Sequence, residues 1–178
     1  MKPLLFAFLL AGRALAQSEI DTIYNEDQKD REGNIMQLDW TKLRERDTVH
    51  RKRVRELLAA GAVTSGKDFE KAAFVFQHGE APDDFLLAHI LAMVAIKKGN
   101  GDAIWIAAAT LDRYLNKIGK PQVLGTQFHA DNGASWTQEP YDRALIIDAL
   151  RRELNVPILD EQVTQLEEMK KAQAAAAK

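Results

Sequence analysis

The chain has 178 residues, of which 46% are hydrophobic and 28% are charged. This composition excludes collagen-like, mucin-like and intrinsically disordered classes, and the length suffices for one domain with one core. The formal net charge of −2 gives no overall attraction to nucleic acid or anionic lipid, and the absence of cysteine excludes disulfides, thiolate metal sites and a cysteine nucleophile.

The N-terminus has the pattern of a secretory signal peptide. Lys2 precedes an apolar run over Leu4–Gly12, and Ala14 and Ala16 form a small-x-small cleavage motif. This run of nine residues is too short to cross a bilayer as a helix. The sequence therefore predicts a signal peptide over residues 1–16 and an exported protein, periplasmic or extracellular, with no membrane span once the signal is removed.

Two helices are predicted next. The polar segment Ser18–Arg31 predicts a short, partly docked helix, and Thr41–Ala60 predicts a second helix that ends at Gly61. Seven basic side chains occur between Lys42 and Arg55, but they spread around the helix with no interleaved aromatic residue. We therefore expect a solvated helix surface there and no nucleic-acid partner.

Local start signals delimit the central helices. Ser65 and Asp68 form the S-x-x-D start of a helix that should end near Gly79. Pro82 occupies the first position of a further helix, which should end at a Gly-Asn-Gly turn. The helix predicted over Asp102–Lys117 comes next, and the alanine-rich faces of these last two helices predict an antiparallel hairpin.

Helical periodicity stops over residues 118–139, where we predict one long, ordered loop with a functional role. It returns over Pro140–Leu154, and a last helix should begin at Asp160 and end in a frayed, alanine-rich tail. We divide the mature chain into a single helical domain over 17–160 and a C-terminal helix over 161–178. The predicted fold is all-α, a compact bundle of about five to seven helices with central antiparallel hairpins.

The predicted core consists of apolar residues that share the inner faces of these helices. They are Phe69, Ala73, Phe76, Leu86, Met93, Ile104, Leu111, Leu145 and Leu150. If the helical registers are right, most of them are buried.

Four short polar motifs occur one after another along the chain. They are Asp27-Gln28 with Arg31, Gln77-His78, Asp112-Arg113, and Pro121-Gln122-x-x-Gly125-Thr126-Gln127. In this order they resemble a family of bacterial exported domains of unknown function that is marked by QH, DR and PQ-x-x-GTQ motifs. The resemblance spans roughly residues 20–160. It implies the fold and the location of a site at these motifs, and it implies no particular activity.

The histidines raise the question of a metal site. His78 and His89 lie on consecutive helices with an axial offset that is too large for one shared ion, and no H-E-x-x-H motif accompanies them. We therefore expect no metal and no cofactor. His78, at a helix C-terminus, is either a general base or a side chain that the helix dipole favours there.

His89 and Asp112 are equally far from the turn near Asn100, so antiparallel packing should place them at the same level. A carboxylate beside an imidazole fixes its tautomer and raises its basicity, as a general base requires. The same pair could be a structural hydrogen bond, which we favour because no nucleophile motif accompanies it. The candidate catalytic residues are His78, His89 and Asp112.

The loop carries the candidate binding groups. Amide and hydroxyl side chains both donate and accept hydrogen bonds, which suits a glycan or a peptide amide, and Arg113 could add a bidentate contact to a carboxylate. The same side chains could instead hold the loop in place. The candidate ligand-binding residues are Gln77, His78, Arg113, Gln122, Thr126 and Gln127.

These observations predict an exported, all-helical protein that binds a small polar ligand or a cell-envelope partner, such as a glycan or a peptide. A metal-independent hydrolase with a histidine general base is one alternative, and a purely structural helical scaffold is another. In every case the loop should fold back over neighbouring helices, because its polar groups need partners.

Overall fold

Helices make up most of the chain that the structure, a computed structural model, describes: residues 19–32, 38–130 and 134–176. Within these ranges there are seven helical segments and no β-strand. They are residues 19–29, α2 (Trp40–Ala59), α3 (Gly66–Phe76), α4 (Pro82–Lys97), α5 (Ala103–Lys117), α6 (Asp148–Glu153) and α7 (Leu159–Ala176). The predicted all-α fold is confirmed, and the predicted signal peptide lies outside the described residues.

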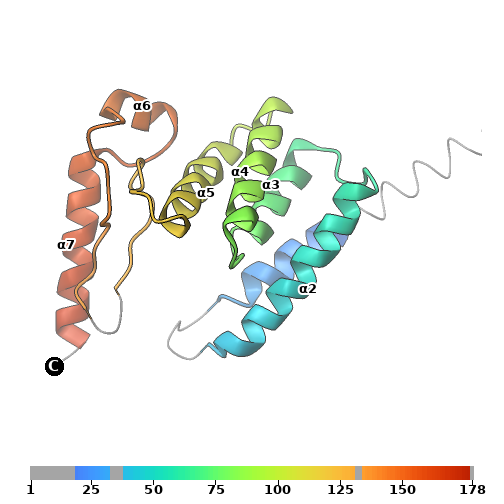
Figure 1. Ribbon diagram of the computed structural model, residues 1–178, viewed down its shortest axis with the longest axis horizontal. Helices are drawn as coiled ribbons and strands as arrows, with labels where there is room; N and C mark the ends of the chain where they lie inside the picture. Colours follow the sequence, from blue (N-terminus) through green and yellow to red (C-terminus); the bar gives the residue numbers. More distant parts are fainter. Residues whose placement is uncertain (1–18, 33–37, 131–133, 177–178) are drawn as a thin grey trace, which may run out of the picture.

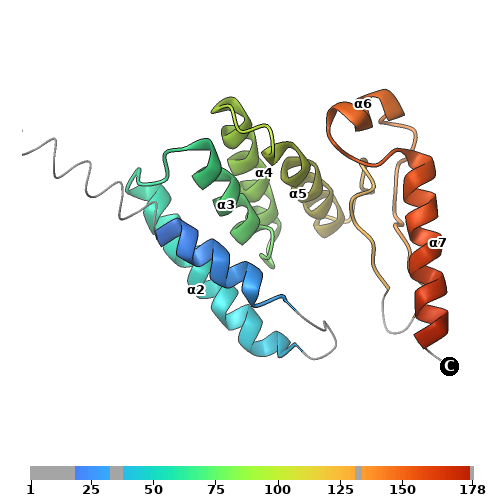
Figure 2. The ribbon, with the colours of Figure 1, turned by 180° about the vertical axis from the view of Figure 1, so that it is seen from behind.

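The helices form a central layer with two flanks. α3, α4 and α5 lie side by side in the middle of the molecule (Figure 1). α2 and the helical segment over residues 19–29 form one flank, and Figure 2 shows that segment lying along α2. The chain after α5, including α6 and α7, forms the other flank. None of the helices in the described ranges is long and apolar enough to span a membrane.

Local chemistry explains where the central helices begin. The Ser65 hydroxyl accepts a hydrogen bond from the Asp68 backbone N–H at 3.1 Å, and the Asp68 carboxylate accepts one from the Ser65 backbone N–H at 2.9 Å. This reciprocal capping box satisfies two N–H groups that the helix itself leaves without partners. Pro82 begins α4, where its missing N–H costs nothing.

The turn between α4 and α5 is anchored to α3. Gly99 adopts a φ of +86°, which a residue without a side chain tolerates best. The side-chain amide of Asn100 then donates to the Glu70 carboxylate at 2.8 Å and to the Gly66 carbonyl at 3.3 Å. The three central helices are therefore joined at this end by polar contacts as well as by their apolar faces.

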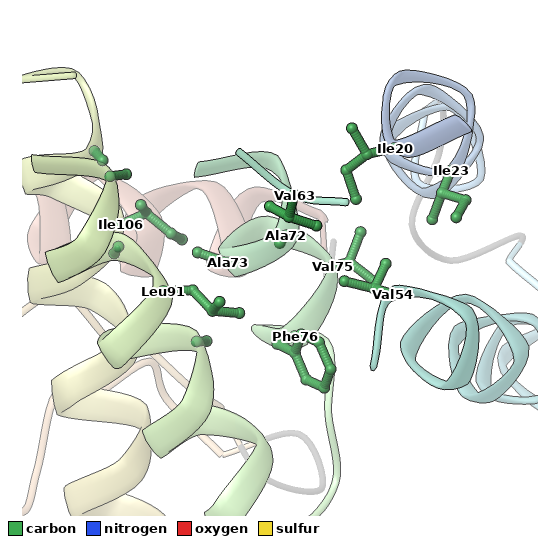
Figure 3. Close-up of a cluster of buried hydrophobic side chains, with 14 of the residues drawn as sticks. Ile20, Ile23, Val54, Val63, Ala72, Ala73, Val75, Phe76, Leu91 and Ile106 are labelled. Atoms are coloured by element: carbon green, nitrogen blue, oxygen red, sulfur yellow. The ribbon is translucent and has the colours of Figure 1, made fainter. Parts of the chain in front are cut away.

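The main core lies between these helices and extends to the first flank (Figure 3). Phe76 and Val75 from α3 and Val54 from α2 are fully buried in it. Alanines such as Ala72 and Ala88 fill the contacts between the central helices, and their small side chains let the helix axes approach closely. Ile20 brings the segment over residues 19–29 into the same cluster.

The prediction of the core is confirmed for some of its residues. Ala73 and Phe76 are buried, whereas Met93 on α4 is 51% exposed. Four further members are partly buried: Phe69, Leu86, Ile104 and Leu111. Met93 is exposed because α4 packs against α3 and α5 through its alanine-rich faces, which leaves a strip of apolar side chains outside.

The helix predicted over Pro140–Leu154 is wrong in its first half, because only α6 is helical there. The Asp142 carboxylate accepts hydrogen bonds from the backbone N–H groups of Ala144 and Leu145, a local turn that competes with a helix. Leu145, expected in the core, lies in this turn and is 61% exposed, and Leu150, which does lie on α6, is 50% exposed.

The buried core leads to a stability prediction. Phe76→Ala should lower the free energy of unfolding by about 3–5 kcal/mol, because it leaves a cavity where a fully buried ring stood. Met93→Ala, at an exposed position, should cost less than about 1 kcal/mol. Urea unfolding followed by circular dichroism measures both values, and equal losses in the two variants would contradict the described core.

Candidate functional site

A buried carboxylate on α5 organises the loop that comes after the helix. Asp112 is fully buried, and its Oδ1 accepts hydrogen bonds from the backbone N–H groups of Val123 at 2.9 Å and Leu124 at 3.1 Å. Its Oδ2 accepts from the Thr126 backbone at 3.0 Å and from the Thr126 hydroxyl at 2.8 Å. Four donors thus satisfy a charge that would otherwise be costly to bury.

The two glutamines of the loop bind each other and the backbone. The Gln122 side chain accepts from the Gln127 N–H and donates to the Gln127 carbonyl, each at 2.9 Å. The Gln127 side-chain amide donates to Thr126 Oγ1 at 2.9 Å and to the Ala109 carbonyl at 3.2 Å. The structure therefore joins Gln122, Thr126 and Gln127 in one hydrogen-bond network over α5. Most of the hydrogen-bond donors of these side chains bond to other groups of the loop.

The loop is in turn clamped by the C-terminal flank. Gly125 has a φ of +78°, and a Cβ atom built there would lie 2.0 Å from Gln162 Oε1 and 2.5 Å from the Tyr141 hydroxyl. That hydroxyl donates to Gln162 Oε1 at 2.9 Å, and the Gln162 amide donates to the Leu124 carbonyl at 2.9 Å. The fully buried Arg151 also donates to the Leu124 carbonyl, at 2.7 Å. The position of Gly125 therefore requires glycine.

The expected pair of His89 and Asp112 does not form. His89 Nδ1 lies 2.9 Å from the carbonyl oxygen of Ala107, five residues before Asp112 and thus more than one helical turn away. Equal distance from a turn sets the axial level only approximately, and it does not set which way a side chain faces. Asp112 faces the loop instead, so no hydrogen bond joins the two side chains.

His78 pairs with the carboxylate of Asp27. The sequence analysis named Asp27 in a motif but did not include it among the candidate site residues. His78 Nδ1 lies 3.0 and 3.1 Å from the two carboxylate oxygens of Asp27, which is fully buried. Arg31 donates to Asp27 Oδ1 at 3.1 Å and to both oxygens of Asp47 at 2.7 and 2.8 Å. The i, i+4 spacing of Asp27 and Arg31 on a polar helix was the available signal.

Arg113 lines a cavity of about 610 Å³ together with Asn116 and Lys117 from the last turns of α5. The other lining residues are Phe85, Gln127, Phe128, His129 and Pro140. The Arg113 Nε atom is shielded from solvent, and within the described ranges the guanidinium has neither a hydrogen bond nor an ion pair. Burial lowers the pKa of this guanidinium, and the positive charge of Arg31 lowers it further.

The cavity therefore contains only two of the six predicted binding residues, Arg113 and Gln127. Gln122 and Thr126 support its wall through the loop network. Gln77 is buried at the end of α3, and neither it nor His78 lines the cavity. Sequence reasoning missed Asn116 and Lys117, although their i+3 and i+4 spacing from Arg113 puts all three on one helix face.

Comparison with protein-family models, with curated proteins and with solved structures finds no match for this chain. The family resemblance drawn from the QH, DR and PQ-x-x-GTQ motifs therefore stays a prediction. Among the residues that the structure describes, no three His, Asp or Glu side chains are grouped as metal ligands would be. The geometry of the cavity is therefore the basis for assigning a function.

Asp112→Asn tests the role of the buried carboxylate. The amide offers one acceptor oxygen in place of two and turns its N–H groups toward backbone N–H donors, so we expect a loss of about 2–3 kcal/mol in the free energy of unfolding. The backbone amides of Val123, Leu124 and Thr126 should exchange hydrogen faster. Asp102→Asn, at the exposed start of α5 where the side chain caps nothing, is the matched control. Unchanged exchange in the loop would contradict this assignment.

Proposed function

We propose that this protein binds a small polar ligand through an anionic group of that ligand, and that Arg113 holds the group. The supporting observation is the unpaired, half-buried guanidinium that lines the cavity. Burying a cation without a partner costs free energy. A carboxylate can accept two parallel N–H bonds from a guanidinium.

The charges around Arg113 also favour an anion. Lys117 and His129 line the same cavity, and none of its eight lining residues is acidic. Arg31 also acts on Arg113, but Asp27 and Asp47 pair with its charge. The negative end of the α5 dipole offsets part of the cost of burying the Arg113 charge, but it gives Nε no acceptor. An anion would reduce repulsion among these basic groups.

The loop residues have a supporting role in this proposal. Because the side-chain donors of Gln122 and Thr126 are used within the loop network, these residues shape the wall and leave the anchoring contact to Arg113. Export through residues 1–16 belongs to the proposal, since it would give the site access to glycans, peptides and other envelope components.

Arg113→Met separates binding from a purely structural role. In the absence of ligand it should raise the free energy of unfolding by about 0.5–2 kcal/mol, because it removes an unpaired cation that is kept for binding. In thermal-shift measurements with acetate, inorganic phosphate, glucuronate and N-acetyl-leucine, at least one anion should stabilise the wild type and none should stabilise the variant.

Arg152→Met, at an exposed position on α6, is the control and should keep the wild-type response. A purely structural role of Arg113 predicts the opposite results for stability and for the response to anions. If Arg113→Met destabilises the protein and no anion raises the wild-type melting temperature, the binding proposal is wrong.

A second candidate function is hydrolysis with His78 as the general base. The contact of His78 Nδ1 with Asp27 favours it, because a carboxylate there orients the ring so that Nε2 can take a proton from water. Arg31 donates to the same carboxylate, and neither His78 nor Asp27 lines the cavity.

This second function predicts turnover. Stabilising ligands that carry a hydrolysable bond, such as the amide of N-acetyl-leucine, should be cleaved on incubation in ¹⁸O-labelled water, with one label entering the product for each bond broken. His78→Gln should abolish the cleavage and keep the ligand-dependent stabilisation. Mass spectrometry detects both the products and the label. Intact ligands after prolonged incubation with wild-type protein would leave binding as the sole function.

A further inference from the structure

The outer face of α4 carries an exposed apolar strip. Ile90 is 49% exposed and Met93 is 51% exposed. Three more apolar residues of this face are partly buried: Leu86, Leu87 and Val94. The strip lies on the side of α4 opposite the alanines through which the helix packs between α3 and α5 (Figure 1). Large apolar side chains that are exposed together on one helix face indicate an interaction surface.

The strip has the residue spacing of a helix–helix seam. Its positions alternate between intervals of three and four residues: Asp83, Leu86, Ile90, Met93 and Lys97. This alternation is the heptad pattern, which keeps one narrow stripe of a helix turned toward a partner helix. All five positions lie within α4, and the stripe extends over nearly its whole length. A second helix is therefore the element that fits this surface.

The apolar part of the strip is symmetric about Ile90. Leu87 and Met93 lie three residues on either side of it, and Leu86 and Val94 lie four residues on either side. When two copies of α4 pack antiparallel with a twofold axis at Ile90, each of these residues faces its counterpart from the other copy. Apolar side chains then meet apolar side chains along the strip, which is the self-complementarity that a twofold interface requires.

The charged ends of the strip match in the same arrangement. Asp83 lies seven residues before Ile90 and Lys97 lies seven residues after it. Both are exposed, and neither forms an ion pair within the described ranges, whereas the neighbouring Asp84 pairs with Arg55. In an antiparallel pair, Asp83 of each copy faces Lys97 of the other copy. A parallel pair would place like charges together at both ends, which is unfavourable.

We propose that two copies of this protein associate through the α4 strip, as an antiparallel helix pair with a twofold axis at Ile90. A helix of 16 residues is about 24 Å long, and one pair of such helices buries less than the roughly 800 Å² per partner of a standard interface. The dimer should therefore exchange with monomers. No residue of the strip lines the cavity at Arg113, so this inference is independent of the proposed function.

Sedimentation velocity of the full chain, over a series from about 5 to about 500 μM, measures this association. The sedimentation coefficient of the wild type should rise with concentration toward that of a dimer. Ile90→Lys places two ammonium groups at the twofold axis and should weaken dimerisation by at least about tenfold. Val163→Lys is the matched control, because Val163 on α7 is also 49% exposed and lies outside the strip. It should associate like the wild type.

Two charge variants test the antiparallel arrangement. In a homodimer of Asp83→Lys, lysines face each other at both ends of the strip, and in a homodimer of Lys97→Asp, carboxylates do. Each variant alone should therefore dimerise several-fold more weakly than the wild type. In an equimolar mixture the heterodimer pairs opposite charges at both ends, so it should exceed both homodimers. Native mass spectrometry distinguishes the three species by mass, and circular dichroism establishes that the variants are folded.

Three results would overturn the inference. The first is a wild type that stays monomeric across the series, even if it binds phosphatidylcholine vesicles in a way that Ile90→Lys abolishes, because the strip would then be a membrane contact. The second is a dimer that Ile90→Lys leaves intact, because its interface would lie elsewhere. The third is an equimolar mixture of the charge variants with no excess of heterodimer, which would contradict the antiparallel arrangement.

Discussion

The buried carboxylate of Asp112 is the interaction on which the rest of the structure depends. The loop after α5 has no repeating backbone pairing of its own, so its N–H groups need acceptors from elsewhere. Asp112 provides them for Val123, Leu124 and Thr126, and the loop provides the donors that a buried negative charge requires. Neither the loop nor the charge could be placed there without the other.

The position of the C-terminal flank depends on this loop. Gly125 approaches Tyr141 and Gln162 so closely that any side chain would collide with them. Arg151 and Gln162 then both donate to the Leu124 carbonyl. The second apolar cluster, around Ala108, Leu124 and Val156, is small. The flank is therefore attached to α5 by directional hydrogen bonds more than by apolar area, which fixes its orientation and with it the wall of the cavity.

Adjacent residues on α5 have opposite environments. Asp112 finds four donors, whereas Arg113, about 100° further round the helix, faces the cavity without an acceptor. The charged groups of the other flank are matched: Asp27 and Asp47 share Arg31, and His78 contacts Asp27. The unpaired guanidinium is therefore the observation on which the proposed binding site rests.

The sequence by itself determined most helix starts, the all-α class and the place where periodicity ends. Signals such as the Ser65–Asp68 capping box and Pro82 act within one helical turn, so they need no knowledge of the rest of the molecule. It also marked Arg113 and the loop as a candidate site, because polar side chains cluster there. Only the tertiary structure decided the partners: Asp112 with the loop and not His89, Asp27 with His78, and Asn116 beside Arg113 in a cavity. The physical reason is that hydrogen-bond partners depend on the rotation and axial offset of packed helices, which residue spacing along one chain does not encode.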